Sequence, residues 1–391
     1  MKGKKFFIAT EKEIEDGKAS DVYFSRSHDL LGQEQVKVVV EITSSTSEEW
    51  INFTGLQEVM ELLKGKDIEM WAIPEGSIIS PRDSLGRNIP FIVIRGEYSK
   101  IMELETAILG FLCQSSGIST ESSKVFMASY PAPFISFGIR RMHPAISPMI
   151  DRAAYIGGAS GVSGILGAEV IGIEPSGTMP HSLALTMGED KAWSYIATHF
   201  KKGTRTLLID TFGDEKFKAI EAAEKFPDID YIRLDTPSSR RGNMAQIIRE
   251  IRWELDIRGH SNIGIMISGG LKKDQLKELR EAGAKVFGVG TSISSARVID
   301  FGMDIVELNG KPITKRGKLS GMKNVYACKT CDFCTIGLFD SKPYCTEHGE
   351  MVPLLQKFME KGQLLRLHEK VSRLRDRSVS ALVERLDKIK Q

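Results

Sequence analysis

Four cysteines crowd into a short stretch near the carboxyl end of the chain. Cys328, Cys331, Cys334 and Cys345 form the pattern C-x2-C-x2-C-x10-C. Thiolates at this spacing satisfy the tetrahedral preference of zinc when the loop between them folds around the ion. With four ligands and no open position implied, we expect a structural zinc that stabilises a small lobe of low apolar content. An iron–sulfur cluster, or His348 in place of one thiolate, is an alternative.

Glycines follow two apolar segments in the second half of the chain, in Ser268-Gly269-Gly270 and in Gly288-Val289-Gly290-Thr291-Ser292. Backbone N–H groups can approach a phosphate closely at glycines, and the last two strand ends of a barrel commonly hold one. We therefore expect a phosphate ester as ligand, with simple tight turns as the alternative. The stretch from Gly158 to Gly164 lacks the G-x-G-x-x-G spacing, so a dinucleotide-binding fold is not indicated.

Two carboxylates, Asp210 and Asp235, each come directly after an apolar strand-like run. At the end of a buried strand such a group could accept ribose hydroxyls, or bind Mg²⁺ beside substrate phosphates. A strand-end aspartate is about as often the N-cap of the following helix. Neither residue is decisive alone.

A histidine and an arginine pair complete the set of candidate polar groups. Among seven histidines, His181 has the most functional setting, because it lies in a Gly- and Pro-containing turn before an expected helix. Arg140 and Arg141 follow the strand-like run that contains Phe137, and a guanidinium beside an aromatic ring suits a planar aromatic carboxylate. A structural histidine and a solvated arginine rim are the alternatives.

The elements that must position these groups alternate between strands and helices, which is typical of a parallel sheet covered by helices. Because the carboxyl ends of parallel strands share one rim, the candidate residues should gather there. The earlier segments 134–138, 154–158 and 168–173 could supply further strands of a barrel. The clearest expected strands are 206–209, 231–234, 263–267 and 285–289, and the helices between them are 214–226, 242–258 and 272–282.

The pattern predicts an α/β chain in three parts: an N-terminal α+β domain (1–115), an irregular α/β barrel (116–300) and a C-terminal region (301–391) with the cysteine lobe and a charged helical tail. The tail is expected from Pro353 onward, packed on its own domain. In the N-terminal domain we expect strands over 36–42, 68–73 and 91–94, and helices over 48–64 and 98–113.

Composition sets further bounds. The 391 residues are 41% hydrophobic and 27% charged, which excludes a disordered or disulfide-dense protein. A net charge of +2 provides no general attraction for nucleic acid or acidic membranes. No apolar run approaches the roughly 18 residues of a membrane span, and the five cysteines are typical of a reduced compartment. We therefore expect a cytoplasmic protein with no nucleic-acid or membrane partner.

Five motifs occur here in the order seen in nicotinate phosphoribosyltransferases, which the chain resembles over about residues 20–300. The likeness extends to the archaeal type of C-terminal lobe with clustered cysteines. The five motifs are Ser136–Arg141, Gly-Thr-x-x-His-Ser at Gly177–Ser182, Arg233–Asp235, Ser268–Gly270 and Gly288–Gly290.

The resemblance implies a type II phosphoribosyltransferase that works as a homodimer or higher oligomer, with its sites at the interface. Its reaction joins nicotinate to 5-phosphoribosyl 1-diphosphate in NAD biosynthesis, with Mg²⁺ and with ATP as co-substrate. By the resemblance, ATP phosphorylates His181, Asp210 orients that histidine and assists Mg²⁺, and Asp235 binds ribose. The transition state has oxocarbenium character on ribose, which agrees with carboxylates near the sugar.

The resemblance also assigns binding roles. Tyr23 would stack on the pyridine ring from the partner chain. A neutral Ser160, where nicotinamide-using relatives carry an aspartate, would favour the acid. Arg140 and Arg233 are expected to line the base pocket, and the 5′-phosphate is expected at Gly269, Gly270, Gly288 and Gly290. Further substrate-binding residues are expected at Phe137, Thr178 and Thr291.

Two other functions stay open at this point. A quinolinate phosphoribosyltransferase would keep the same rim and change the base, although a dicarboxylate would need more cations than this pocket shows. A nucleic-acid-binding protein built on the zinc lobe and the Arg-rich tail is disfavoured by the near-neutral charge.

Overall fold

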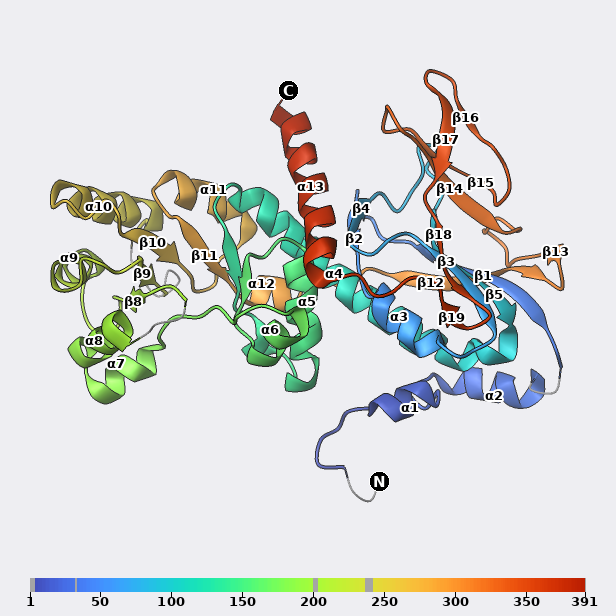
Figure 1. Cartoon of the computed structure of the whole chain (residues 1–391), viewed down its shortest axis with the longest axis horizontal. Coiled ribbons are helices and arrows are strands. Elements are labelled where there is room, and N and C mark those ends of the chain that lie inside the picture. The colour runs from blue at the N-terminus through green and yellow to red at the C-terminus, as the bar shows by residue number, and fades with distance from the viewer. Residues whose placement is uncertain (1–3, 32–33, 200–202, 236–241, 391) are drawn as a thin grey trace. The chain divides into compact units, whose positions relative to one another are not determined.

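The computed structural model describes residues 4–31, 34–199, 203–235 and 242–390 (Figure 1). These fall into two compact units. One contains Met1–Gly117 with Arg297–Lys370, and the other contains Ile118–Ala296 with Val371–Gln391. The expected separate C-terminal region 301–391 is therefore divided between the two. The reason is strand pairing, because the chain beyond the parallel sheet returns to the N-terminal antiparallel sheet.

The second unit is built on a six-stranded sheet in the order β7-β6-β11-β10-β9-β8, in which all neighbouring strands are parallel. It forms an irregular half-barrel, in agreement with the expected α/β class. Of the four clearest predicted strands, β9 has the predicted bounds. The other three, β8, β10 and β11, each differ from the prediction by one residue at one end. The strands are β6 (Phe134–Ser136), β7 (Gly161–Val162), β8 (Thr206–Leu208), β9 (Tyr231–Leu234), β10 (Gly264–Ile267) and β11 (Val286–Val289).

Helices alternate with these strands, as the sequence predicts. Side-chain caps start two of them: Asp214 accepts from the N–H of Lys216, and Asn243 accepts from the N–H of Gln246. The helices are α5 (Ser147–Ile156), α6 (Ile165–Ile171), α7 (His181–Met187), α8 (Glu189–His199), α9 (Glu215–Lys225), α10 (Met244–Ile257), α11 (Lys273–Glu281), α12 (Thr291–Ser294) and α13 (Val371–Lys390).

Two expected strands in this unit are wrong. Residues 154–158 end helix α5, and residues 168–173 lie mostly in helix α6; the strand between them is the short β7. A short apolar run suits a buried helix face as well as a buried strand, so its period does not distinguish the two.

The first unit is organised around a seven-stranded sheet in the order β13-β12-β1-β5-β3-β18-β19, with a smaller sheet β15-β14-β17-β16 that carries the cysteines. The strands are β1 (Lys37–Ser44), β2 (Ile51–Phe53), β3 (Ile68–Ala72), β4 (Ser77–Ile79), β5 (Pro90–Glu97), β12 (Phe301–Leu308), β13 (Lys311–Pro312), β14 (Lys323–Cys328), β15 (Cys334–Leu338), β16 (Tyr344–Cys345), β17 (Gly349–Pro353), β18 (Gln356–Glu360) and β19 (Gln363–Leu364).

The helices of this unit are α1 (Glu11–Glu15), α2 (Val22–Leu31), α3 (Leu56–Leu63) and the start of α4 (Glu105–Ser129), within which the unit boundary falls. The expected helix 48–64 is instead strand β2 followed by α3. Gly55 permits this switch, because its φ is +93° and a Cβ there would stand 2.5 Å from the carbonyl oxygen of Phe111.

The C-terminal tail is helical only from Val371. Residues 353–370, expected as part of the helix, contain strands β18 and β19, and β18 pairs with β3. Helix α13 packs on α5, with Leu374 and Leu382 buried. The tail thus packs on the parallel-sheet unit.

Apolar side chains fill both sides of the parallel sheet. Leu207, Ile232, Ile265 and Phe287, one from each of four neighbouring strands, are fully buried in one cluster. The candidate polar groups therefore lie at or just beyond the carboxyl ends of the strands, with Arg233 inside the end of β9.

Candidate active site at the carboxyl rim of the parallel sheet

The carboxyl ends of five strands bring candidate residues together at one rim. Asp210 follows β8 after one residue, Asp235 follows β9, Ser268 follows β10 and Gly290 follows β11. Phe137 follows β6, and its N–H donates to the carbonyl oxygen of Val289 at 2.8 Å. The parallel register therefore gathers motifs that are up to about 150 residues apart in sequence.

Arg233 is fixed at the centre of this rim. Its Nε donates to Oγ of Ser268 at 2.8 Å, and its Nη2 donates to Oδ1 of Asp235 at 2.5 Å. Its Nη1 donates to Oγ1 of Thr178 and, at 3.4 Å, to the carbonyl oxygen of Met179. All three guanidinium nitrogens thus have partners, so the arginine is held in one orientation.

The ring of Phe137 lies against this guanidinium, 5.5 Å from its centre. Gly288 makes room for the ring, because a Cβ at position 288 would stand 2.6 Å from two ring carbons. Gly288 is itself buried inside β11 and paired to β6. In the structure this glycine makes room for the ring, and its expected role as a phosphate contact stays a prediction.

His181 begins helix α7 and reaches the two acidic residues. Its Nε2 lies 3.8 Å from Oδ1 of Asp210 and 3.6 Å from Oδ2 of Asp235, and it makes no hydrogen bond to the described residues. Its Nδ1 lies 3.1 Å from Oγ1 of Thr211. Two carboxylates beside Nε2 favour a proton on that nitrogen, which leaves the lone pair of Nδ1 for the Thr211 hydroxyl.

Asp210 ties two strand ends together. Its Oδ2 accepts a hydrogen bond of 2.7 Å from the backbone N–H of Asp235, and its side chain is only 3% exposed. Asp210, Asp235 and His181 therefore form one cluster, as the sequence predicts. The sequence reasoning expected Asp210 to hold a ring nitrogen directly, whereas the closest contact of the imidazole is with Thr211.

The remaining glycines lie in the two turns beside this cluster. Gly269 and Gly270 have positive φ values of 91° and 72°, which only glycine adopts readily. Gly290 precedes α12, whose first residue Thr291 is exposed. The hydroxyl of Ser292 donates to the carbonyl oxygen of Leu271 at 3.2 Å and links the two turns. Exposed backbone N–H groups in such turns suit an anionic ligand.

Two expected base-pocket residues have different outcomes. Arg140 lies in the turn after β6, exposed and without an ion pair among the described residues. Ser160 comes before β7, and both its N–H and its Oγ donate to the carbonyl oxygen of Phe134 at 2.8 Å. It therefore lies at the amino end of β7, and its expected contact with the base stays a prediction. The rim positions after β7 are Ser163 and Gly164.

Tyr23 belongs to the other unit. It lies on α2 and is 58% exposed, with its ring 4.4 Å from that of Phe24. Its hydroxyl donates to Asp21 at 3.4 Å. An exposed aromatic side chain is compatible with the expected contact to a partner chain.

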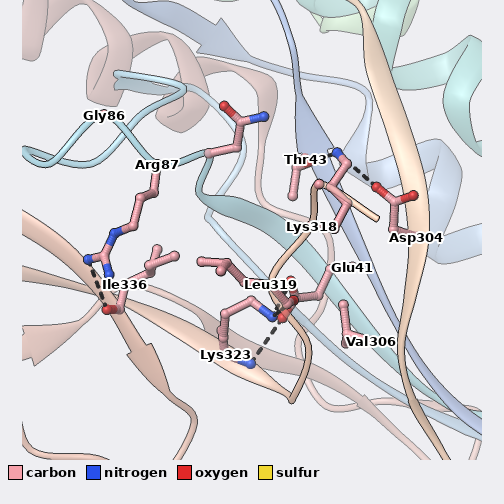
Figure 2. A pocket seen from close by; sticks show the side chains of 12 residues that line it. Glu41, Thr43, Gly86, Arg87, Asp304, Val306, Lys318, Leu319, Lys323 and Ile336 are labelled. Atoms are coloured by element: carbon pink, nitrogen blue, oxygen red, sulfur yellow. Dashed lines mark hydrogen bonds and ion pairs between the residues drawn. The ribbon is translucent and has the colours of Figure 1, made fainter. Parts of the chain in front are cut away.

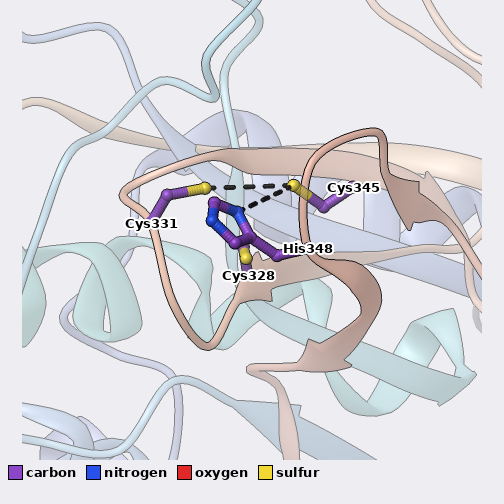
Figure 3. Close-up of side chains that lie close together, drawn as sticks. All are labelled: Cys328, Cys331, Cys345 and His348. Carbon is purple, nitrogen blue, oxygen red and sulfur yellow. Dashed lines mark hydrogen bonds between the residues drawn. The ribbon is translucent and has the colours of Figure 1, made fainter.

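The cysteine lobe gathers four side chains that could hold a metal ion, but not the four expected (Figure 3). Ligand atoms of Cys328, Cys331, Cys345 and His348 all lie within 4.8 Å of one another. Hydrogen bonds from the N–H groups of Cys331 and Thr330 lower the pKa of the Cys328 thiol to about 6. Three thiolates and one imidazole match a tetrahedral zinc site.

Cys334 does not join the cluster, so this part of the expected zinc set is wrong. It starts strand β15 opposite Ala327, and its N–H donates to Oγ of Ser84 at 2.9 Å. Burial raises the pKa of its thiol to about 11, with a further contribution from Asp83. The pairing of β15 with β14 turns Cys334 toward the apolar core of the first unit.

A charged cavity of about 360 Å³ lies in the first unit, between the seven-stranded sheet and the cysteine lobe (Figure 2). On its lining, Glu41 pairs with Lys323 at 3.1 Å and Asp304 pairs with Lys318 at 2.9 Å. Burial raises the pKa of Glu41 to about 7 against the attraction of Lys323. Because both acids already have cationic partners, we assign this cavity no ligand.

Sequence reasoning missed two hydroxyls of the rim, those of Thr211 and Ser268. Each directly follows, or starts, a motif that was recognised: Thr211 follows Asp210, and Ser268 precedes Gly269. Their position in the sequence could have identified them, because any residue just past a buried strand lies on the rim.

Comparisons with known proteins agree with this architecture. The chain matches the family model for the quinolinate phosphoribosyl transferase N-terminal domain over residues 21–116 and that for the C-terminal domain over residues 118–304. It is 42% identical to the nicotinate-nucleotide pyrophosphorylase of Pyrococcus furiosus, over 98% of this chain and 99% of that one, with a TM-score of 0.91.

More distant relatives share the fold or parts of the sequence. Human nicotinic acid phosphoribosyltransferase has a TM-score of 0.76 at 16% identity, over 93% of each chain. A nicotinate phosphoribosyltransferase of Mycobacterium tuberculosis is 28% identical over 77% of this chain. The chain spans about 65% of the length of that relative.

A parallel half-barrel joined to a separate α+β unit, with arginine, aspartates and glycine turns on its carboxyl rim, defines a type II phosphoribosyltransferase. Within that class, the chain belongs to the nicotinate and quinolinate phosphoribosyltransferase family. No helix in the described part of the chain is long and apolar enough to cross a membrane.

Proposed function

We propose that the protein is a nicotinate phosphoribosyltransferase, which joins nicotinate to 5-phosphoribosyl 1-diphosphate and releases nicotinate mononucleotide and diphosphate in NAD biosynthesis. The observation that carries this proposal is the Arg233 cluster. A fully bonded guanidinium lies between the ring of Phe137 and the carboxylate of Asp235. The curated relatives named nicotinate phosphoribosyltransferase, and the Pyrococcus relative named for nicotinate nucleotide, support the same substrate class.

The base would bind beside Phe137 and the two arginines. The ring of Phe137 offers an apolar face, and Arg140 is exposed and available for a carboxylate. The preference for the acid over its amide would rest on the neutral Ser160, where nicotinamide-using relatives carry an aspartate. An aspartate there would oppose the attraction of the arginines for an anion.

The sugar and its phosphates would occupy the acidic side of the rim. Asp235 keeps Oδ2 free of the arginine and can accept a ribose hydroxyl. The turns at Gly269–Gly270 and Gly290–Thr291 would bind the 5′-phosphate through backbone N–H groups. As the bond to diphosphate breaks, positive charge develops on ribose, and the two carboxylates stabilise it. Mg²⁺ would be bound beside Asp210 and would neutralise the leaving diphosphate.

His181 would accept a phosphoryl group from ATP. The carboxylates near Nε2 hold a proton there, so Nδ1 keeps the lone pair that attacks phosphorus. Thr211 would hold the imidazole in this tautomer before the transfer. This assigns Asp210 to the orientation of Nε2 and Thr211 to that of Nδ1.

A structural zinc would be bound by Cys328, Cys331, Cys345 and His348. These side chains fit the ion in number, type and spacing. The lobe packs few apolar residues of its own, chiefly Tyr326, Cys345 and Met351, so a metal would contribute much of its folding free energy.

Quinolinate is the competing substrate, because the matched family models carry that name. One assay separates the candidates. The protein is incubated with 5-phosphoribosyl 1-diphosphate, Mg²⁺ and each of nicotinate, nicotinamide or quinolinate, with and without ATP. We expect nicotinate mononucleotide from nicotinate only, and faster with ATP. Product and CO₂ from quinolinate alone would show that the protein is a quinolinate phosphoribosyltransferase instead. The absence of product from all three bases would refute the proposal.

A further inference from the structure

A buried hydroxyl joins the two charged groups at the centre of the rim. Oγ of Ser268 accepts from Nε of Arg233 at 2.8 Å and donates to Oδ1 of Asp235 at 2.6 Å. The serine is only 1% exposed. A serine hydroxyl has one proton to donate, and the other acceptor in reach, the carbonyl oxygen of Leu234, is farther away at 3.4 Å.

This contact saturates one oxygen of Asp235. Oδ1 receives both the Ser268 hydroxyl and Nη2 of Arg233, at 2.6 and 2.5 Å. Oδ2 receives neither, and it is this oxygen that lies 3.6 Å from Nε2 of His181. The hydrogen bonds therefore fix which carboxylate oxygen faces the reacting groups.

The packing around Ser268 leaves it little freedom. A Cβ at position 288 would stand 2.9 Å from Cβ of Ser268, so the neighbouring strand approaches as closely as a glycine allows. The N–H of Ser268 donates to the carbonyl oxygen of Leu234, which anchors its backbone to β9. The hydroxyl thus sits at a fixed point between Arg233 and Asp235.

We infer that Ser268 is a positioning residue: it holds the Arg233 guanidinium over the ring of Phe137 and turns Oδ2 of Asp235 toward substrate and His181. The expected effect of Ser268 on the reaction rate rests on the proposed function. Its expected effect on the orientation of Arg233 and Asp235 does not. Without the hydroxyl, Nε of Arg233 loses its acceptor and Oδ1 of Asp235 loses one of two donors. Both charged groups are then held by fewer hydrogen bonds and can shift from this orientation.

The first test is spectroscopic and needs no substrate. In ¹H–¹⁵N spectra, the Nε–H signal of an arginine persists only while a hydrogen bond slows its exchange with water. The Arg233 signal is assigned by its absence in Arg233→Lys. We expect it in the wild type and its loss in Ser268→Ala. Ser122→Ala is the matched control, because that serine is also buried in this unit but donates to the carbonyl oxygen of Ala154, at 2.6 Å. An unchanged Arg233 signal in Ser268→Ala would overturn the inference.

The second test is kinetic. We expect Ser268→Ala to lower kcat/KM about 10- to 100-fold, as the loss of a hydrogen bond to charged groups does. Ser122→Ala should lose similar thermal stability and keep kcat/KM within about twofold. In an Asp235→Asn background the Ser268→Ala effect should shrink, since the two residues act together. Equal effects in both backgrounds would contradict the positioning role. If the wild type is inactive on nicotinate, the proposed function is refuted. The spectroscopic test alone then shows whether Ser268 positions Arg233.

Discussion

The backbone N–H of Asp235 donates to the carboxylate of Asp210 across 2.7 Å, so that one catalytic candidate holds the main chain of the other. The two residues end neighbouring parallel strands, β8 and β9. Asp210 therefore has two roles: its charge lies beside His181, and its Oδ2 accepts the backbone N–H at the end of β9. Different substitutions at position 210 should remove one role without the other.

We predict that Asp210→Asn folds normally and loses most of the ATP stimulation. The asparagine carbonyl oxygen can still accept the Asp235 N–H, but the charge beside Nε2 of His181 is gone. Asp210→Ala should in addition lower the melting temperature, because a buried backbone N–H loses its acceptor, at a cost of about 1–3 kcal/mol. Rates with and without ATP, together with thermal unfolding of both variants, measure the two effects. Equal stability losses in both variants would contradict the backbone role.

His181→Ala should abolish ATP stimulation and leave some basal transfer, because its imidazole accepts the phosphoryl group while the carboxylates remain. Thr211→Val should weaken ATP stimulation and Thr211→Ser should restore it, since only the hydroxyl contacts Nδ1. Initial rates at saturating nicotinate, with and without ATP, distinguish these variants. If His181→Ala still responds to ATP, the histidine has no part in phosphoryl transfer.

Gly288→Ala should impair base binding and reduce stability by about 1–3 kcal/mol, because its methyl would collide with the Phe137 ring and with Ser268. Gly302→Ala is the matched control: that glycine is also in a strand, and no atom lies within 4 Å of the added Cβ. KM for nicotinate and urea unfolding report on the two properties. A Gly288→Ala enzyme with unchanged KM would show that the ring position does not matter for the base.

Metal content should follow the side chains that the structure gathers. We expect about one zinc per chain in the wild type, and loss of zinc and of the folded lobe in Cys331→Ser or His348→Ala. Cys334→Ser should retain the metal, because this residue lies outside the cluster. Elemental analysis of the purified variants decides. If Cys334→Ser loses zinc and His348→Ala keeps it, the metal is bound by the four cysteines instead.

Asp151 predicts a pH dependence of stability. It is fully buried in α5, and burial raises the pKa of its carboxyl to about 7, against the opposing effect of the Gly164 N–H. Because the pKa is higher in the folded chain, the folded state keeps a proton that the unfolded chain has released. The contribution of this group to stability is therefore greatest at low pH and is lost as the pH rises from about 4 to about 7.

Asp151→Asn should remove this loss, so that the variant exceeds the wild type above pH 7 by up to about 4 kcal/mol, the equivalent of the whole shift. Chemical unfolding at several pH values from 4 to 8 measures the difference. Asp274→Asn, an exposed aspartate of α11, should show no such difference. Parallel stability curves for wild type and Asp151→Asn would disprove the raised pKa.

Much of the parallel sheet could be read from the chain. The apolar runs that become β8 to β11, and the residues directly after them, were identifiable because strand burial and βα alternation are local patterns. That Asp210, Asp235 and the glycine turns share one rim also followed, since parallel strands have a common carboxyl end. The sequence therefore predicted the fold class and the edge of the sheet at which the candidate residues gather.

Tertiary structure decided what depends on pairing between distant segments. The register of β7 beside β6 puts Ser160 at the amino edge, and the pairing of β15 with β14 removes Cys334 from the metal cluster in favour of His348. The hydroxyls of Ser268 and Thr211 became functional candidates only when Arg233 and His181 were found against them. Local sequence indicates strands and helices where their period is clear. The direction and neighbours of a side chain depend on strands and helices remote in the chain.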